Sequence, residues 1–209
     1  MSGPYTLRFT EEMKGWFSYG EREFQRGRDR GRSEGSSLRF HLTITVADVH
    51  RFIADAEHTA EARGWIESDA LGGRLPVGRG IFNLFVTQGP RGRRMLYRLF
   101  FEDAVGHPLT LSGFKEISGG TAAEVWPETS TLYVRVLQGH VGSEDDQAAT
   151  VVGSGILRIP PLAFLRQLTT FRVQGPELSG RARALVDFVR LFAGQLVALF
   201  LLPSRRVAT

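Results

Sequence analysis

The stretch from Met95 to Glu116, MLYRLFFEDAVGHPLTLSGFKE, constrains the fold more than any other part of the chain. Its aromatic and aliphatic residues favour extended structure, and a glycine and a proline interrupt them. The pattern therefore predicts a β-hairpin with strands Met95–Glu102 and Pro108–Glu116, joined by the turn Asp103–His107. Successive side chains of a strand point to opposite faces, and in the first strand both faces are largely apolar. Other parts of the chain must therefore cover each face.

Alternating and apolar runs predict further strands before and after this hairpin. The clearest is Leu38–Val46, in which apolar and polar residues alternate without a break. The others are predicted at Tyr5–Phe9, Met13–Tyr19, His58–Ser68, Gly80–Thr87, Ser130–Leu137, Val151–Ile159 and Phe171–Gln174, with Leu71–Val77 as a loop or short edge strand. Short connections and the lack of strand–helix–strand alternation favour an all-β, mainly antiparallel meander. Closing it into a barrel, lipocalin-like in outline, would remove its exposed edges.

The remaining segments are predicted as short helices and loops. Ala47–Ala54 is expected to be a short helix with Asp48 as its N-cap, and Pro160–Thr169 a second one because proline suits a first helical turn. Glycine and charged residues predict a solvated, partly mobile loop around Arg26–Gly35, an exposed acidic loop at Gly142–Thr150 and a loop at Ile117–Pro127.

The end of the chain predicts one long helix, from Ser179 to Leu202. Asp187 and Arg190 are spaced to pair on one face of it. We expect this helix to pack on the barrel and to cover the hairpin. Association with a membrane surface or with a second copy is the alternative, and a spanning segment is least favoured because it would need about 20 apolar residues. The chain is thus expected to be one domain, 1–209, with the barrel strands in 1–175 and the helix at 179–202.

Composition narrows the function classes. The chain has no cysteine, which excludes structural disulfides, cysteine-ligated metals and thiol catalysis. The absence of cysteine favours a cytoplasmic location. The N-terminus lacks the basic region followed by an apolar run that a secretory signal needs, which favours the same location. Of the 26 basic residues, all but Lys14 and Lys115 are arginine. The basic cluster at Arg26–Arg32 lacks lysine and aromatic residues, so nucleic-acid binding is not expected.

A few side chains stand out as candidates for chemistry. Lys115 ends the apolar row of Leu109 and Leu111 in a chain that otherwise uses arginine, and a lysine offers a compact ammonium. His41 lies mid-strand beside two threonines, and Tyr97 lies within an apolar strand face. These three are the candidate catalytic residues. None of the five histidines has the spacing of a local metal site, so no metal and no cofactor are expected. The candidate ligand-lining residues are Phe40, Asn83, Phe85, Tyr97, Leu99, Phe101, Leu111 and Tyr133.

Several segments together resemble a known protein region. They are HLTITVADVHRFIADAEHT, ALGGRLPVGRGIFNLFV, RRMLYRLFFEDAVGHPLTLSGFKEI, TLYVRVLQGH and FLRQLTTFRVQG. The chain from about Phe9 to Leu199 resembles the accessory β-rich region of actinobacterial GMC-type flavin oxidoreductases of the cholesterol-oxidase-like kind. The glycine-rich turn of their flavin domain is missing, because GRDRGRSEG follows no apolar strand. The resemblance therefore implies nearby hydrophobic substrates, such as sterols, terpenoids or other lipids, and the redox activity of the family is not carried over.

Three functions are compatible with these patterns. The first is binding of a hydrophobic small molecule, sterol-, terpenoid- or polyketide-like, inside the barrel. The second is a cofactor-free cyclase or isomerase of secondary metabolism that uses the same pocket. The third is an interaction subunit of an oxidoreductase that docks through the C-terminal helix. An enzyme should carry a titratable group inside the barrel, whereas an interaction subunit should expose an apolar stripe on Leu185–Leu202.

Overall fold

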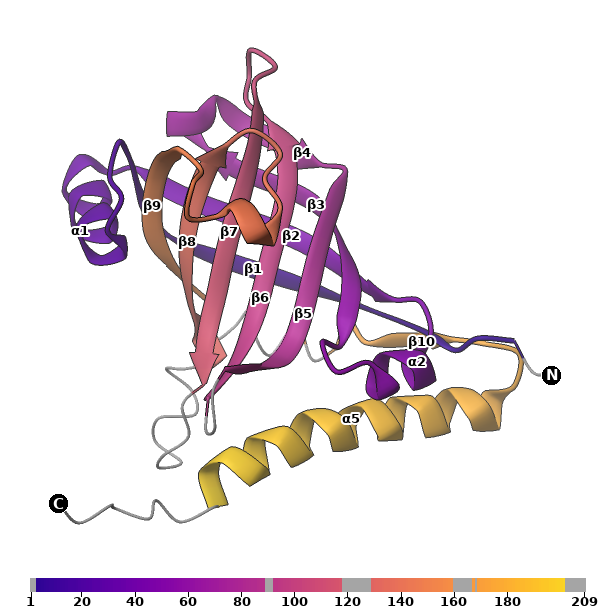
Figure 1. Cartoon of the computed structure of the whole chain (residues 1–209). Helices are drawn as coiled ribbons and strands as arrows, with labels where there is room; N and C mark the ends of the chain where they lie inside the picture. The colour runs from indigo at the N-terminus through magenta and orange to yellow at the C-terminus, as the bar shows by residue number, and fades with distance from the viewer. Residues whose placement is uncertain (1–2, 89–91, 118–128, 160–166, 168, 202–209) are drawn as a thin grey trace, which may run out of the picture.

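The strands form one antiparallel sheet that closes on itself. The structure, a computed structural model, describes residues 3–88, 92–117, 129–159, 167 and 169–201 (Figure 1). Eight strands follow each other around the barrel, and the last pairs with the first. They are β1 (Thr6–Tyr19), β2 (Ser37–Val46), β3 (Thr59–Ser68), β5 (Arg79–Gln88), β6 (Gly92–Glu102), β7 (Pro108–Ile117), β8 (Thr131–Gln138) and β9 (Val151–Arg158). The predicted all-β antiparallel barrel is confirmed.

Strand β1 is shared between three neighbours. The sequence predicted two strands here, whereas the chain runs as one continuous strand of 14 residues. One edge of β1 pairs with β2. The other edge pairs first with the short strand β10 (Arg172–Gln174) and then, from Lys14 to Tyr19, with β9. Between these two pairings the edge has no strand partner in the described part of the chain, and the Thr10 N–H donates to Thr170 Oγ1 at 3.0 Å.

The β1–β9 seam that closes the barrel is built on glycine. A Cβ on Gly155 would collide with the carbonyl oxygen of Trp16, and one on Gly15 would collide with that of Ile156. Side chains at these positions would hold the two strands apart. The seam therefore depends on glycine for close approach of two backbones.

The predicted Arg/Gly/Ser loop is wrong, because residues Phe24–Glu34 form the helix α1. Gly27 and Gly31 lie one turn apart and are both buried where the helix meets the barrel wall. A Cβ on Gly31 would be 2.5 Å from the carbonyl oxygen of Phe17. These glycines allow close helix packing instead of chain mobility. The arginines lie on the outer side, and Arg30 pairs with Glu34 at 2.8 Å.

The other predicted helix and edge strand are present. Helix α2 (Val49–Ala54) begins after Asp48, whose Oδ1 accepts the N–H of His50 at 2.9 Å, which confirms the predicted N-cap. The short strand β4 (Gly73–Val77) pairs with β3 and lies off the main strand path. Short 3-10 turns occur at η1 (Asp69–Leu71) and η2 (Ser143–Asp145), the latter inside the predicted acidic loop. The predicted loop 117–127 and helix 160–169 fall largely outside the described residues.

The β6–β7 hairpin has the predicted strands, and its inward row is buried. On the outer face, the Arg79 guanidinium lies 4.2 Å from the ring centroid of Phe100, and that of Arg94 lies 4.4 Å from Phe114. Phe24 of α1 adds an edge contact to Phe114 at 5.6 Å. The cover over this face therefore comes from stacked arginines and α1, and the predicted cover by the C-terminal helix is wrong.

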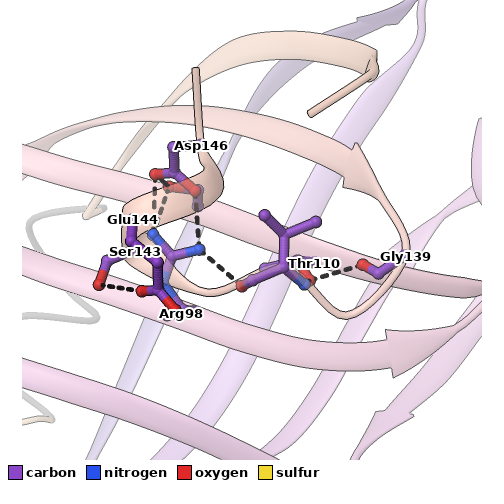
Figure 2. Close-up of polar contacts among 8 residues, drawn as sticks. Arg98, Thr110, Gly139, Ser143, Glu144 and Asp146 are labelled. Carbon is purple, nitrogen blue, oxygen red and sulfur yellow. Dashed lines mark hydrogen bonds and ion pairs between the residues drawn. The ribbon is translucent and has the colours of Figure 1, made fainter. Parts of the chain in front are cut away.

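The loop between β8 and β9 covers the rest of this outer face (Figure 2). Arg98 of β6 donates to both carboxylate oxygens of Asp146 at 2.8 Å each. Ser112 of β7 donates to the same carboxylate at 2.9 Å. Thr110 donates to the carbonyl of Gly139 at 2.7 Å, which fixes the start of the loop. The Arg98 side chain is 13% exposed, so this pair is better shielded from water than a surface pair.

The C-terminal helix α5 (Leu178–Leu201) lies across one end of the barrel (Figure 1). Its Phe188 is buried and contacts the rings of Phe9, Phe52 and Phe171. Further along, Phe192 contacts Phe85 of β5 with ring centroids 5.3 Å apart. The prediction that this helix packs on the barrel is confirmed. Within the described residues, no helix is long and apolar enough to cross a membrane.

The close contact at Gly31 of α1 predicts that alanine substitution there lowers stability, whereas alanine substitution at an exposed helix position raises it. In an exposed helix position glycine is about 1 kcal/mol less favourable than alanine, so Gly194→Ala in α5, where a Cβ meets nothing within 4 Å, should stabilise the fold slightly. Gly31→Ala should instead destabilise it by about 1–3 kcal/mol, because the new methyl group overpacks the contact with β1. Urea unfolding of the two variants measures both effects, and a stabilised Gly31→Ala protein would contradict the packing role of α1.

Candidate functional site

Three polar side chains meet inside the largely apolar barrel. Lys115 Nζ lies 2.5 Å from Glu11 Oε1, and the Tyr97 hydroxyl donates to Glu11 Oε2 at 2.8 Å. Lys115 Nζ also lies 5.3 Å from the centroid of the Tyr97 ring. Both oxygens of the carboxylate are therefore engaged, one by a cation and one by a neutral donor. We call these three residues the interior cluster.

Strand alternation places all three side chains on the inner face. Glu11 lies between the buried Phe9 and Met13 on β1, in the stretch that has β2 on one edge only. Tyr97 belongs to the inward row of β6. Lys115 continues the inward row of β7 and is paired in register with Met95. Tyr97 and Lys115, which lie 86 and 104 positions from Glu11 along the chain, thus become its direct neighbours.

Burial makes the pairing of these charges obligatory. Glu11 and Lys115 are each 2% exposed. Removing a charge from water costs several kcal/mol, and only a close partner with good geometry offsets that cost. The short Nζ–Oε1 distance and the second bond from Tyr97 supply this geometry. The interior cluster is therefore pre-organised, with each member held by another.

Tyr97 keeps its proton far into the alkaline range. Its complete burial raises the pKa of the phenol well above the ordinary value of 10.0, and the negative charge of Glu11 and the hydrogen bond to Glu11 act in the same direction. The tyrosine is thus a permanent donor to the carboxylate. It fixes the orientation of Glu11 while Lys115 supplies the positive charge.

Aromatic side chains surround the cluster. The ring of Phe82 contacts Tyr97 edge-on with centroids 5.0 Å apart, and the ring of Phe40 lies 6.0 Å away. Two buried methionines, Met13 and Met95, are neighbours of Glu11 and Lys115 in the strand pattern. Methionine side chains are flexible and adapt to different shapes. The interior thus combines one charged pair with an apolar, partly adaptable wall.

The structure brings Lys115 and Tyr97 together, but His41 lies elsewhere. Its neighbours Phe40 and Leu42 are buried, whereas His41 is half-buried on the outer face and stacks on Trp65 with centroids 5.8 Å apart. It cannot act with the other two candidates. His41 and its threonine neighbours therefore face outward, because the aliphatic and aromatic residues of β2 take the inner face.

Most candidate lining residues point inward, with two exceptions. Asn83 lies on the outside and donates to Thr59 Oγ1 at 3.1 Å. Tyr133 stacks on Phe114 of the outer face with centroids 5.4 Å apart. Each of the two residues lies between inward-pointing apolar neighbours, so these two lining assignments do not hold. The buried members of the predicted set are Phe40, Phe85, Tyr97, Leu99, Phe101 and Leu111.

Sequence reasoning missed Glu11. The two predicted strands ended at Phe9 and resumed at Met13, which left Glu11 and Glu12 in the gap between them. The signal was nevertheless present, because Leu7, Phe9 and Met13 share one parity and Glu11 has the same parity. A single continuous strand would have placed its carboxylate inside.

The end of the barrel beneath α5 contains strained backbone. The pairing of β5 with β6 shifts register between Asn83 and Val86, and Phe85 within this bulge has φ of 56°. His58 has φ of 44°, and its backbone carbonyl accepts the Leu84 N–H at 3.2 Å. Such backbone is costly for non-glycine residues and occurs often at ligand sites. The bulge turns Phe85 toward Phe192 of α5.

No family model, curated protein or solved structure matches the chain. The resemblance to the accessory region of flavin oxidoreductases therefore stays a prediction. Within the residues that the structure describes, no group of three acidic or histidine side chains could hold a metal ion. The interior cluster is thus the strongest candidate site on geometric grounds.

The ion pair predicts strong coupling between its two members. Lys115→Met and Glu11→Gln should each lower the free energy of unfolding by about 3–5 kcal/mol, because each leaves the partner buried without its counterpart. The double variant should lose less free energy of unfolding than the two single variants added together, with a coupling energy of about 1–3 kcal/mol. The exposed pair Glu61–Arg63 is the control, and its cycle should give less than about 1 kcal/mol. Additive losses at Glu11 and Lys115 would contradict the pairing.

The raised pKa of Tyr97 predicts a loss of stability at high pH. Above pH 10 the unfolded chain releases this phenol proton while the folded protein retains it, so alkali favours the unfolded state. The contribution to the slope is about 1.4 kcal/mol per pH unit. Urea unfolding between pH 8 and 11 should show a shallower decline for Tyr97→Phe, while Tyr19→Phe, at an exposed position, should keep the wild-type slope. Equal slopes for wild type and Tyr97→Phe would refute the assignment.

Proposed function

We propose that the barrel binds an apolar small molecule that carries an oxygen acceptor, of sterol-, terpenoid- or polyketide-like character. The observation that supports this function is the Lys115–Glu11–Tyr97 cluster within an aromatic interior. Ligand sites are typically apolar walls with a few fixed polar groups, and the interior cluster has this composition.

The energetic cost of the cluster favours a role beyond stability. Replacing a buried ion pair by well-packed apolar residues is often neutral or stabilising by a few kcal/mol. The interior of an eight-stranded barrel is either filled by side chains or holds one small ligand. A lysine and a glutamate in this position therefore point to a use of their charge, and recognition of a ligand oxygen is the simplest use.

The donor capacity of Lys115 fits this role. An ammonium carries three N–H donors, and Glu11 accepts from one of them. A carbonyl or hydroxyl oxygen of the ligand would take a second donor. The apolar body would then lie against Phe40 and Phe82, with Met13 and Met95 shifting to accommodate it.

Entry through the end covered by α5 fits the position of the cluster. Lys115 lies two residues before the end of β7, and this end of the strand points toward the side on which α5 lies (Figure 1). The strained Phe85 and the ring of Phe192 meet at the same end. A shift of α5 would open a path to the interior without breaking the barrel ladder.

A cofactor-free cyclase or isomerase remains a second candidate on the same observation. An ammonium and a phenol beside one carboxylate can polarise a carbonyl group of a bound substrate. Such an enzyme would convert the compound it retains, whereas a binding protein would release it unchanged. Partners for the outer side of α5, where Val186 and Val189 are 46% and 52% exposed, such as a second copy or a membrane surface, stay predictions.

Native mass spectrometry tests the binding function directly. The protein is incubated with an apolar extract and separately with geraniol and cholesterol, and retained compounds are identified by mass. We expect the wild type to retain a ligand and the Lys115→Met/Glu11→Gln variant to bind it about tenfold or more weakly, because a charge-assisted hydrogen bond is lost. The Arg63→Met/Glu61→Gln protein is the matched control and should bind normally. A folded wild type that retains nothing would refute the proposal.

A further inference from the structure

We propose that Lys115 forms a reversible imine with an aldehyde or ketone group of the ligand. This inference rests on the proposed binding function and narrows the ligand class to apolar carbonyl compounds. It uses the one property of Lys115 that arginine could not supply, a primary amine that becomes nucleophilic when it gives up a proton. The chain has two lysines, and Lys115 is the buried one.

The neighbours of Lys115 supply what imine formation needs. Glu11 Oε1, at 2.5 Å from Nζ, is in position to accept a proton from the ammonium. Tyr97 holds the other carboxylate oxygen and keeps the acceptor in place. The apolar walls limit access of water, which would hydrolyse an imine. Nucleophile, proton acceptor and positioning residue are thus present in one buried group.

The reaction balances without any further reactant. The ammonium passes one proton to Glu11, and the free amine attacks the carbonyl carbon to form a carbinolamine. A second N–H proton moves to the former carbonyl oxygen, so that a neutral carbinolamine carries a hydroxyl group. Glu11 returns its proton to this hydroxyl, the C–O bond breaks, and water leaves as the C=N bond forms. Two hydrogens of the ammonium thus depart with the carbonyl oxygen.

The product fits the electrostatics of the site. The iminium ion keeps the single positive charge of the ammonium, so the pairing with the Glu11 carboxylate persists after reaction. The face of the Tyr97 ring, 5.3 Å from Nζ, also favours a cation there. The buried pair therefore needs no change in net charge on binding a carbonyl compound, which is the condition for keeping it stable inside the barrel.

Reductive trapping tests this inference. The probe is geranial with sodium cyanoborohydride, applied to a Lys14→Arg protein in which Lys115 and the terminal amine are the only amines left. We expect a geranyl adduct on Lys115, mapped by peptide mass spectrometry, and none at this position in Lys115→Arg. Glu11→Gln should slow trapping about 100-fold. The mapping needs no Lys115 variant, so it holds even if Lys115→Arg fails to fold.

Geraniol, which lacks the carbonyl group, separates the two proposals. Binding of geraniol together with an adduct on Lys115 supports both. Binding of geraniol with no adduct on Lys115, or with labelling confined to the terminal amine, overturns the imine and leaves the binding function intact. Failure of both geraniol binding and trapping, with no ligand retained from the apolar extract, overturns the imine and the binding function together.

Discussion

The closure of the sheet by β1 and β9 is the constraint on which the rest of this structure depends. It requires two backbones to approach where Gly15 and Gly155 leave no side chain between them. Once the seam closes, every strand has an inside, and the inward rows of β1, β6 and β7 face one another. Helix α1 then packs on the outer side of the same seam through Gly27 and Gly31. One run of close contacts thus fixes both the barrel and its first helix.

Closure also dictates the chemistry of the interior. A carboxylate on β1 and an ammonium on β7 cannot remain apart in an apolar enclosure, so Glu11 and Lys115 must pair. The hydroxyl of Tyr97 completes the arrangement. The outer face solves a different problem, since its aromatic residues are covered by arginine side chains that keep their charge near water. The arginines thus have a structural role on the outside of the barrel, where they cover aromatic residues. The single buried lysine, Lys115, is instead a candidate for a chemical role.

Local patterns predicted much of the fold. The β6–β7 hairpin, the alternation of β2, the Asp48 cap and the C-terminal helix follow from residues that are neighbours in sequence. Helix α1 was missed because glycine and charge favour a loop when the helix is judged alone, and only the barrel wall explains why glycine is required. Strand parity placed Lys115 on one face with Leu109 and Leu111, but it did not show that this face is the inner one. It also did not reveal the partner of Lys115, because Glu11 lay between two predicted strands.

The sequence alone therefore determined the class of fold, the strand faces that Tyr97 and Lys115 share with apolar residues, and the presence of a helix after the barrel strands. These depend on alternation, capping and turn residues, which act over a few positions. Only the tertiary structure decided that Glu11 meets Lys115 from 104 positions away, that His41 lies outside, and that α5 covers the barrel end instead of the hairpin. Such long-range juxtapositions arise from sheet closure and register, which no local pattern encodes.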